Sequence, residues 1–315
     1  MIRSSRSVAA FWWLSAMSSA APAPVEVFVL GIAQDGGLPH MGCAEERCER
    51  ARRDPNLRLH GSGLGVVDRE HGQAFVLDAT PDFEAQVARL RAAAALPPSS
   101  GRNPVAAILL THAHIGHYLG LAQLGREVAA TQRLPLYGTP RMAAFLRGNA
   151  PWSQLVELEQ VELREVGPGS VVELTPTLSA QPLAVPHRDE LSDTVAWLLS
   201  ARGRRLLYLP DIDKWQKWSI DIRDLLKTVD LAFIDGSFFD AGELPGRDLS
   251  EIPHPTIQES MATIGPRRPD ARAQVYFIHL NHTNAALDQG GAARRRVLEA
   301  GYHIAREGDR FLLAP

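Results

Sequence analysis

The residues best suited to chemistry in this sequence are three histidines in the stretch Thr111-His112-Ala113-His114-Ile115-Gly116-His117. They are three of the chain's 11 histidines, and they directly follow the apolar run 105–110 (VAAILL). Imidazoles at positions i and i+2 of a loop can both face one point, as a tetrahedral metal requires. A lone histidine is more often an ordinary core or surface residue, but three so close together at the end of a buried strand predict a metal site.

Polar residues elsewhere in the chain also stand where an apolar run stops. These residues are Asp78, Asp211, Asp235 and His279. Strand ends that meet at one rim allow α/β folds to assemble a site from distant sequence positions. We therefore expect these side chains to lie close to the histidine stretch.

The elements that must position these residues follow from apolar periodicity and from turn residues. Strands are expected over 25–30, 63–67, 74–77, 105–110, 134–137, 194–198, 205–209, 231–234 and 275–278. Helices are expected over 83–95, 118–130, 140–146, 220–227, 256–264 and 291–300. Such a mixture predicts one α/β domain over residues 22–315.

The composition and net charge are those of an ordinary globular protein. The chain has 315 residues, of which 45% are hydrophobic and 22% charged, and its formal net charge is -3. This balance gives no electrostatic reason to expect a nucleic acid as a partner. A small-molecule substrate is the expected partner.

The N-terminus predicts a secretory signal peptide over residues 1–21. Arg3 and Arg6 precede the apolar run 8–17, and small residues follow at 18–21. This order of basic, apolar and small residues is typical of a cleaved signal, and the run is too short to span a membrane. We expect a periplasmic or secreted protein with no stable membrane span after cleavage. The alternative is a leader that stays in the cytosol.

The chain has two cysteines, Cys43 and Cys48, separated by four residues. In an oxidising compartment, such a pair predicts a disulfide that closes a short loop. The alternative is a structural metal clip with His40 as a third ligand.

The histidine stretch resembles the HxHxDH signature of the metallo-β-lactamase superfamily, and further motifs of that superfamily follow in order. Asp78 matches the aspartate that braces the site from behind, and His187 matches the histidine that joins His112 and His114 at the first metal. Asp211 matches the carboxylate that bridges two metals, and His117 and His279 match ligands of the second metal. The resemblance implies an αββα sandwich of two mixed sheets, with the metal at one edge.

Gly116 departs from the signature, because it stands where the superfamily has its aspartate. Loss of an anionic ligand weakens the second position. We therefore expect one tightly bound zinc and a second that is weak or absent. Imidazole and carboxylate ligands also suit iron or manganese.

A narrower resemblance is to the branch of pyrroloquinoline-quinone biosynthesis protein B. It is carried by Val29-Leu30-Gly31, by Asp35-Gly36-Gly37, by Gly42-Cys43 with Cys48, and by the segments 234–238 and 278–284. Members of that branch are cytosolic and usually have a degenerate histidine motif. This chain differs in its expected signal peptide and in keeping all three histidines.

A site of this kind supports two classes of reaction. A metal with an open position activates water and polarises a carbonyl or phosphoryl oxygen. With Asp211 to orient or deprotonate that water, the expected reaction is hydrolysis of an ester, amide, lactone or phosphodiester. The alternative, from the narrower resemblance, is an iron-dependent oxidoreductase or a protein of cofactor biosynthesis or transport. A decayed site that only binds is a third interpretation.

Three further residues are candidates for the surroundings of the site. Arg188 follows His187 and could hold an anionic substrate, or it could belong to a solvated loop. His254 lies between two prolines and could line the pocket, or it could belong to a rigid surface loop. His282 competes with His279 as a ligand or supports it, and we prefer His279 because it ends the strand.

Overall fold

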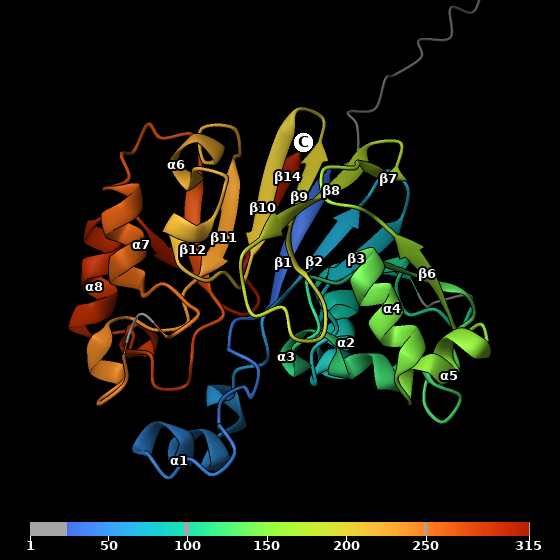
Figure 1. The fold of residues 1–315 in the computed structure, drawn as a ribbon, viewed down its shortest axis with the longest axis horizontal. Helices are drawn as coiled ribbons and strands as arrows, with labels where there is room; N and C mark the ends of the chain where they lie inside the picture. Colours follow the sequence, from blue (N-terminus) through green and yellow to red (C-terminus); the bar gives the residue numbers. More distant parts are fainter. Residues whose placement is uncertain (1–23, 98–100, 249–250, 315) are drawn as a thin grey trace, which may run out of the picture.

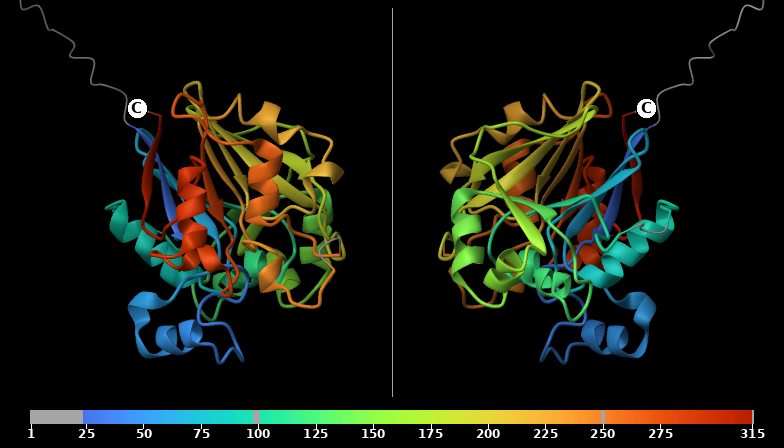
Figure 2. Two further views of the ribbon diagram at one scale, coloured as in Figure 1. Left: turned by 90° about the vertical axis from the view of Figure 1, so that its left-hand side faces the viewer. Right: turned by 90° about the vertical axis from the view of Figure 1, so that its right-hand side faces the viewer.

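Two sheets pack face to face in the computed structural model, with helices on both outer sides (Figure 1, Figure 2). The structure describes residues 24–97, 101–248 and 251–314. The expected αββα sandwich is therefore confirmed. The expected signal peptide over residues 1–21 lies outside the described residues.

The first sheet has seven strands, antiparallel at one end and parallel at the other. From edge to edge they are β14 (Arg310–Ala314), β1 (Val25–Gly31), β2 (Gly63–Asp68), β3 (Gln73–Leu77), β4 (Ala107–Leu109), β5 (Leu134–Gly138) and β6 (Val161–Glu165). The parallel pairing of β3 with β4 places their carboxyl ends at the same edge of the sheet.

The second sheet repeats this plan with seven more strands. They are β13 (His303–Ile304), β12 (Gln274–Ile278), β11 (Leu231–Asp235), β10 (Arg204–Leu209), β9 (Thr194–Ala201), β8 (Leu178–Val185) and β7 (Val172–Thr175). Strands β10, β11 and β12 run parallel, so their carboxyl ends also share one edge.

The inner faces of the sheets are apolar and hold the main core. Trp197, Tyr208 and Phe233 are among its largest fully buried side chains. β1 is buried along its whole length, and its one charged residue, Glu26, pairs with Arg69 and Arg310. A buried carboxylate needs such partners, because an unpaired charge in the core is costly.

Eight α-helices are found in the described residues. They are α1 (Glu46–Arg53), α2 (Phe83–Ala93), α3 (Ile115–Tyr118), α4 (Pro140–Gly148), α5 (Trp152–Glu157), α6 (Ile222–Leu225), α7 (Ile257–Ile264) and α8 (Ala292–Glu299). α2, α4 and α5 lie on the side of the first sheet, and α6, α7 and α8 lie on the side of the second (Figure 1). α1 stands at one end of the sandwich, away from both layers (Figure 2).

The helix expected over 118–130 is wrong in extent. Only α3 and a short 3₁₀ helix, η2 (Leu119–Leu124), form in this region. Here Gly120 packs directly against the backbone of the segment after β3. A Cβ on Gly120 would lie 2.1 Å from the carbonyl oxygen of Thr80. Tertiary contact therefore overrides the apolar periodicity of this segment.

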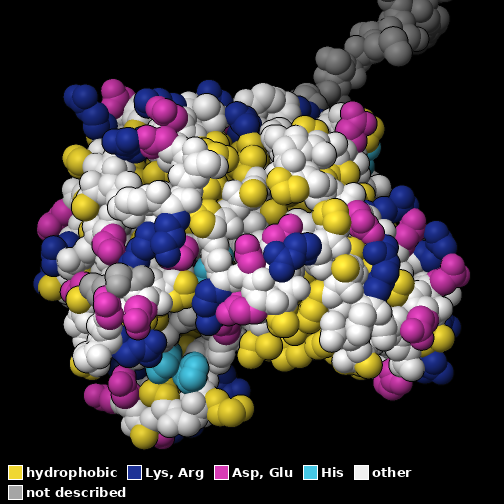
Figure 3. All heavy atoms as spheres, viewed as in Figure 1, with side chains coloured by type: hydrophobic (Ala, Val, Ile, Leu, Met, Phe, Trp, Pro, Cys, Tyr) yellow, Lys and Arg dark blue, Asp and Glu magenta, His cyan; other side chains and the backbone are white. Residues whose placement is uncertain are grey.

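Charged side chains of both signs are interspersed over the face shown in Figure 3. Across the described ranges, no helix has the length and apolar character needed to cross a membrane.

Candidate metal centre

The polar residues that follow the strands meet at one edge of the sandwich. Asp78 follows β3, and His112 follows β4 after two residues. From the other sheet, His187 follows β8, Asp211 follows β10 and His279 follows β12. Parallel strands end at a common edge, so residues about 200 positions apart become neighbours.

Four of the predicted ligands surround a first position. His112 Nε2 lies 2.9 Å from His114 Nδ1, and His187 Nε2 lies 3.7 Å from Asp211 Oδ1. One nitrogen of each of the three histidines lies within 4.8 Å of the others. Ligands about 2.1 Å from a tetrahedral zinc are separated by about 3.4 Å, so these spacings fit a metal.

The protonation of these histidines also suits a metal. Burial and the neighbouring histidines hold the pKa of His112 and of His279 well below the usual value. Burial, together with His254 and His114, lowers the pKa of His187 to about 2. Both ring nitrogens of His187 are buried without a hydrogen-bond partner. Neutral imidazoles with free lone pairs are the form that metals bind.

A second position lies next to the first, on the other side of Asp211. Asp211 Oδ2 is 3.0 Å from His117 Nε2 and 3.3 Å from His279 Nε2. Each of these three atoms is buried without a partner in hydrogen-bond geometry. Burial alone would lower the pKa of His117, but Asp78 and Asp211 raise it well above its usual value.

Asp78 contacts the ring nitrogen of His117 that points away from Asp211. Its carboxylate is fully buried and lies 2.8 Å from His117 Nδ1. It also accepts hydrogen bonds from the Thr111 amide at 2.8 Å, the Thr111 hydroxyl at 2.9 Å and the Tyr208 hydroxyl at 3.2 Å. Because Asp78 engages Nδ1, the Nε2 atom of His117 faces Asp211.

Two residues of the site have an unusual backbone conformation. Asp78 has φ 65° and His279 has φ 63°, and both stand directly after a strand. Side chains other than glycine rarely adopt positive φ, and such strain concentrates at functional sites. In this conformation, the side chain of Asp78 faces His117 and that of His279 faces Asp211.

Asp235 and His254 form a supporting pair on the side of the second sheet. His254 is buried, and its Nδ1 lies 2.8 Å from Asp235 and 3.7 Å from Asp211. Asp235 also accepts hydrogen bonds from the backbone and hydroxyl of Ser237, which touches His279 Nδ1 at 3.0 Å. The surface-loop alternative for His254 is wrong, because its ring belongs to the site.

The rim beside His187 is charged. Arg188 is half exposed and lies 3.8 Å from Glu190, whose other oxygen lies 3.3 Å from His114 Nε2. Four residues that support the site were not predicted from the sequence: Glu190, Thr111, Tyr208 and Ser237. Thr111 and Glu190 stood beside predicted ligands, but nothing in the sequence marked the contacts of Tyr208 or Ser237.

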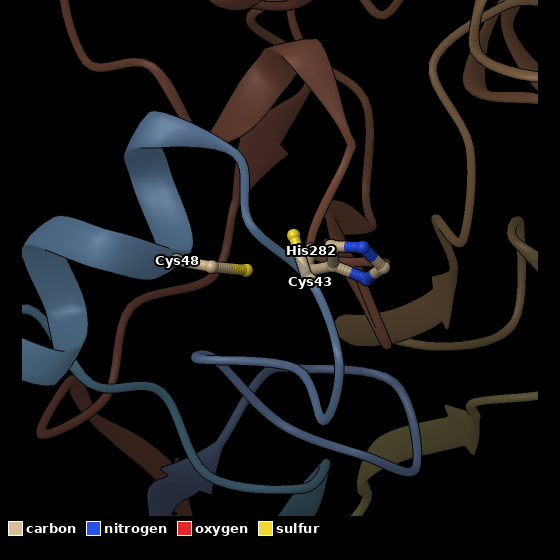
Figure 4. A group of neighbouring side chains, drawn as sticks. All are labelled: Cys43, Cys48 and His282. Atoms are coloured by element: carbon tan, nitrogen blue, oxygen red, sulfur yellow. The ribbon is translucent and has the colours of Figure 1, made fainter.

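The two cysteines belong to a separate cluster with His282 (Figure 4). Cys43 and Cys48 are free thiols, and ligand atoms of these cysteines and His282 lie within 4.8 Å of one another. Burial and the neighbouring Cys43 thiol raise the pKa of Cys48. The two thiols are grouped with His282 and not with the expected His40, so His282 is the candidate third ligand of a metal clip. His40 stacks on His282, with ring centroids 4.3 Å apart.

His282 is therefore placed away from the histidine stretch, and the choice of His279 over His282 agrees with the geometry. His282 Nδ1 is buried without a hydrogen-bond partner. Arg47 of α1 donates to the carbonyl oxygens of His282 and Asn284 at 2.8 and 3.0 Å. These two hydrogen bonds join α1 to the loop that follows β12.

The chain matches one family model and is similar to known proteins over most of its length. Residues 73–280 match the family model of the beta-lactamase superfamily domain. Coenzyme PQQ synthesis protein B of Methylobacterium sp. (strain 4-46) is 27% identical over 308 residues, which cover 90% of this chain and 98% of that protein. The protein of the same name from Ruegeria pomeroyi is 26% identical and covers 92% of this chain.

Solved structures give the same fold. Zinc-bound PqqB from Methylobacterium extorquens superposes with a TM-score of 0.76 at 23% identity, covering 91% of this chain and 99% of that chain. A diphosphatase from the PhnP family superposes with a TM-score of 0.62 at 21% identity, covering 92% of this chain and 98% of that one. The chain therefore belongs to the beta-lactamase superfamily and is similar to PqqB over nearly all of its length.

Proposed function

We propose that this protein is a PqqB-like metalloenzyme that acts on a small molecule at a metal held by His112, His114, His187 and Asp211. The observation that carries the proposal is the convergence of these four side chains at one edge of the sandwich, where buried atoms of His187 and Asp211 have no hydrogen-bond partner. The alignment covers 90% of this chain and 98% of a PQQ synthesis protein B. That extent supports a reaction on a cofactor or its precursor over generic hydrolysis.

The protein residues would prepare the site in distinct ways. A metal with an open coordination position lowers the pKa of bound water and polarises a carbonyl or phosphoryl oxygen, and iron would add oxygen chemistry. Asp211 reaches both metal positions and can orient a water or accept its proton. Asp235 fixes His254, whose Nδ1 lies 3.7 Å from Asp211.

Hydrolysis is the second candidate, and one observation favours it. All three histidines of the stretch 112–117 face the centre, which is the donor set that water activation needs. Ester, amide, lactone and phosphodiester bonds are the substrate classes. The half-exposed Arg188 at the rim would hold an anionic group of such a substrate.

The two candidate functions differ in the metal that their turnover requires, and this difference can be tested. Apoprotein is loaded with Zn²⁺ or, anaerobically, with Fe²⁺, and His114→Ala serves as the site-dead control. Oxygen consumption that needs Fe²⁺ and a quinone-like substrate would support the PqqB-like reaction. Turnover of aryl esters or bis(p-nitrophenyl) phosphate with Zn²⁺ would support hydrolysis instead. Metal-loaded protein that turns over neither class would contradict both.

Export is proposed from residues 1–21 alone. Expression of the full chain in a Gram-negative host, fractionation, and mass determination of the N-terminus test it. A periplasmic product lacking about 20 residues supports export, and full-length protein in the cytosol contradicts it.

A further inference from the structure

The second metal position lacks the carboxylate that the superfamily signature supplies, because residue 116 is glycine. His117, His279 and Asp211 still face that position. Two imidazoles and one shared carboxylate leave a divalent cation short of anionic ligands.

The space beside Gly116 is filled by Asp35. A Cβ built on Gly116 would lie 2.0 Å from Asp35 Oδ1 and 2.7 Å from Asp35 Cα. Contacts this short with a backbone atom cannot be relieved by moving a side chain. With Asp35 in its present position, there is therefore no space for a side chain at position 116.

Asp35 also points toward the second position. Its Oδ1 is buried without a hydrogen-bond partner and lies 3.7 Å from His117 Nε2. Ligand atoms of Asp35, His117 and His279 lie within 4.8 Å of one another. Buried polar atoms are nearly always paired, so several unpaired atoms that converge on one point are suited to bind a cation.

The loop that carries Asp35 is tied to the segment that carries His279. The Gln34 amide donates to the Leu280 carbonyl at 2.9 Å, and the Leu280 amide donates to the Ile32 carbonyl at 2.7 Å. Asn281 Nδ2 donates to Gln34 Oε1 at 2.7 Å. These bonds, made by the residues just before Asp35, join the loop of Asp35 to the segment that carries His279.

We infer that Asp35 takes the place of the missing carboxylate and, with His117, His279 and the shared Asp211, binds a second divalent cation. The inference rests on the proposed function, because Asp211 is shared with the first position at His112. It replaces the expectation of a weak or absent second metal with that of a complete dinuclear centre, whose fourth ligand comes from the loop after β1.

The test counts the zinc bound by protein variants in which Asp35 is replaced. Apoprotein is incubated with Zn²⁺, passed over a desalting column and analysed for metal per chain, and the affinity is measured by competition with a chelator. The variants are Asp35→Asn and Asp35→Gly. Glu45→Gln removes an exposed charge from the same segment and is the matched control. Any metal at the cysteine cluster adds equally to every variant.

We expect Asp35→Asn and Asp35→Gly to bind one zinc fewer than wild type, or to bind it more than about tenfold more weakly. Glu45→Gln should match wild type. Circular dichroism checks that each variant is folded. A wild-type zinc count and affinity in folded Asp35→Asn would overturn the inference. If His114→Ala binds as much zinc as wild type, the proposed function fails, independently of the result for Asp35.

Discussion

Replacing Asp78 by asparagine tests how the strand ends control the metal site. In wild type, Oδ1 accepts from the amide and hydroxyl of Thr111, while Oδ2 faces His117 Nδ1 at 2.8 Å and the Tyr208 hydroxyl at 3.2 Å. The amide oxygen can keep the Thr111 bonds, but the NH₂ group then faces the other two donors. His117 must lose this bond or move its proton to Nε2, which removes the lone pair that a metal needs.

The magnitude follows from these contacts. Loss of a partner that orients a metal ligand costs about 10- to 100-fold in metal affinity, which is about 1.4 to 2.8 kcal/mol. An unsatisfied buried donor costs about 1 to 3 kcal/mol. With two donors affected, we expect Asp78→Asn to lower the free energy of unfolding of the apoprotein by about 2 to 4 kcal/mol.

Chelator competition and urea unfolding measure the two effects separately. Asp68→Asn is the matched control, because Asp68 is also a fully buried carboxylate and accepts hydrogen bonds from the hydroxyls of Thr175 and Thr177. Asp68 is the last residue of β2, at the end of that strand far from Asp78. We expect Asp68→Asn to lose stability and to keep its metal affinity. Wild-type metal affinity in Asp78→Asn, or equal losses of affinity in both variants, would refute the role assigned to Asp78.

Further predictions concern the first metal position, the cysteines and a remote ion pair. His114→Ala should lose one metal equivalent and at least about 100-fold of any turnover. Elemental analysis and the activity assay check this, and a wild-type metal content with wild-type turnover would contradict the site. Thiol titration of denatured, unreduced protein should find Cys43 and Cys48 both free, and Cys48→Ser should lose one metal equivalent; two unreactive cysteines would indicate the disulfide instead. The hydrogen bond to Glu307 raises the pKa of His60 above its usual 6.5. Its stabilisation is therefore complete below about pH 6.5 and is lost as pH rises through the folded-state pKa. Thermal unfolding should show that His60→Gln costs more stability at pH 5.5 than at pH 8.5, and an equal cost at both would contradict this.

Much of the site was predictable because it stands at strand ends. His112, His187, Asp211 and His279 each follow an apolar run, and parallel strands carry such residues to a common edge. The sandwich followed from the order of these motifs and from the resemblance they carry. Element boundaries were less predictable: the segment 118–130 has helical periodicity, yet it is bent onto the backbone at Thr80.

What only the tertiary structure decided is which residues far apart in sequence share one point in space. Gly116 read alone predicted a lost ligand, because nothing in the sequence relates it to Asp35, 81 positions earlier. The same holds for the contact of His282 with the cysteines. Local periodicity fixes where a strand ends and which side chain follows it. The distance between two loops depends on how both sheets pack, so the partners that complete each cluster became visible only in the folded chain.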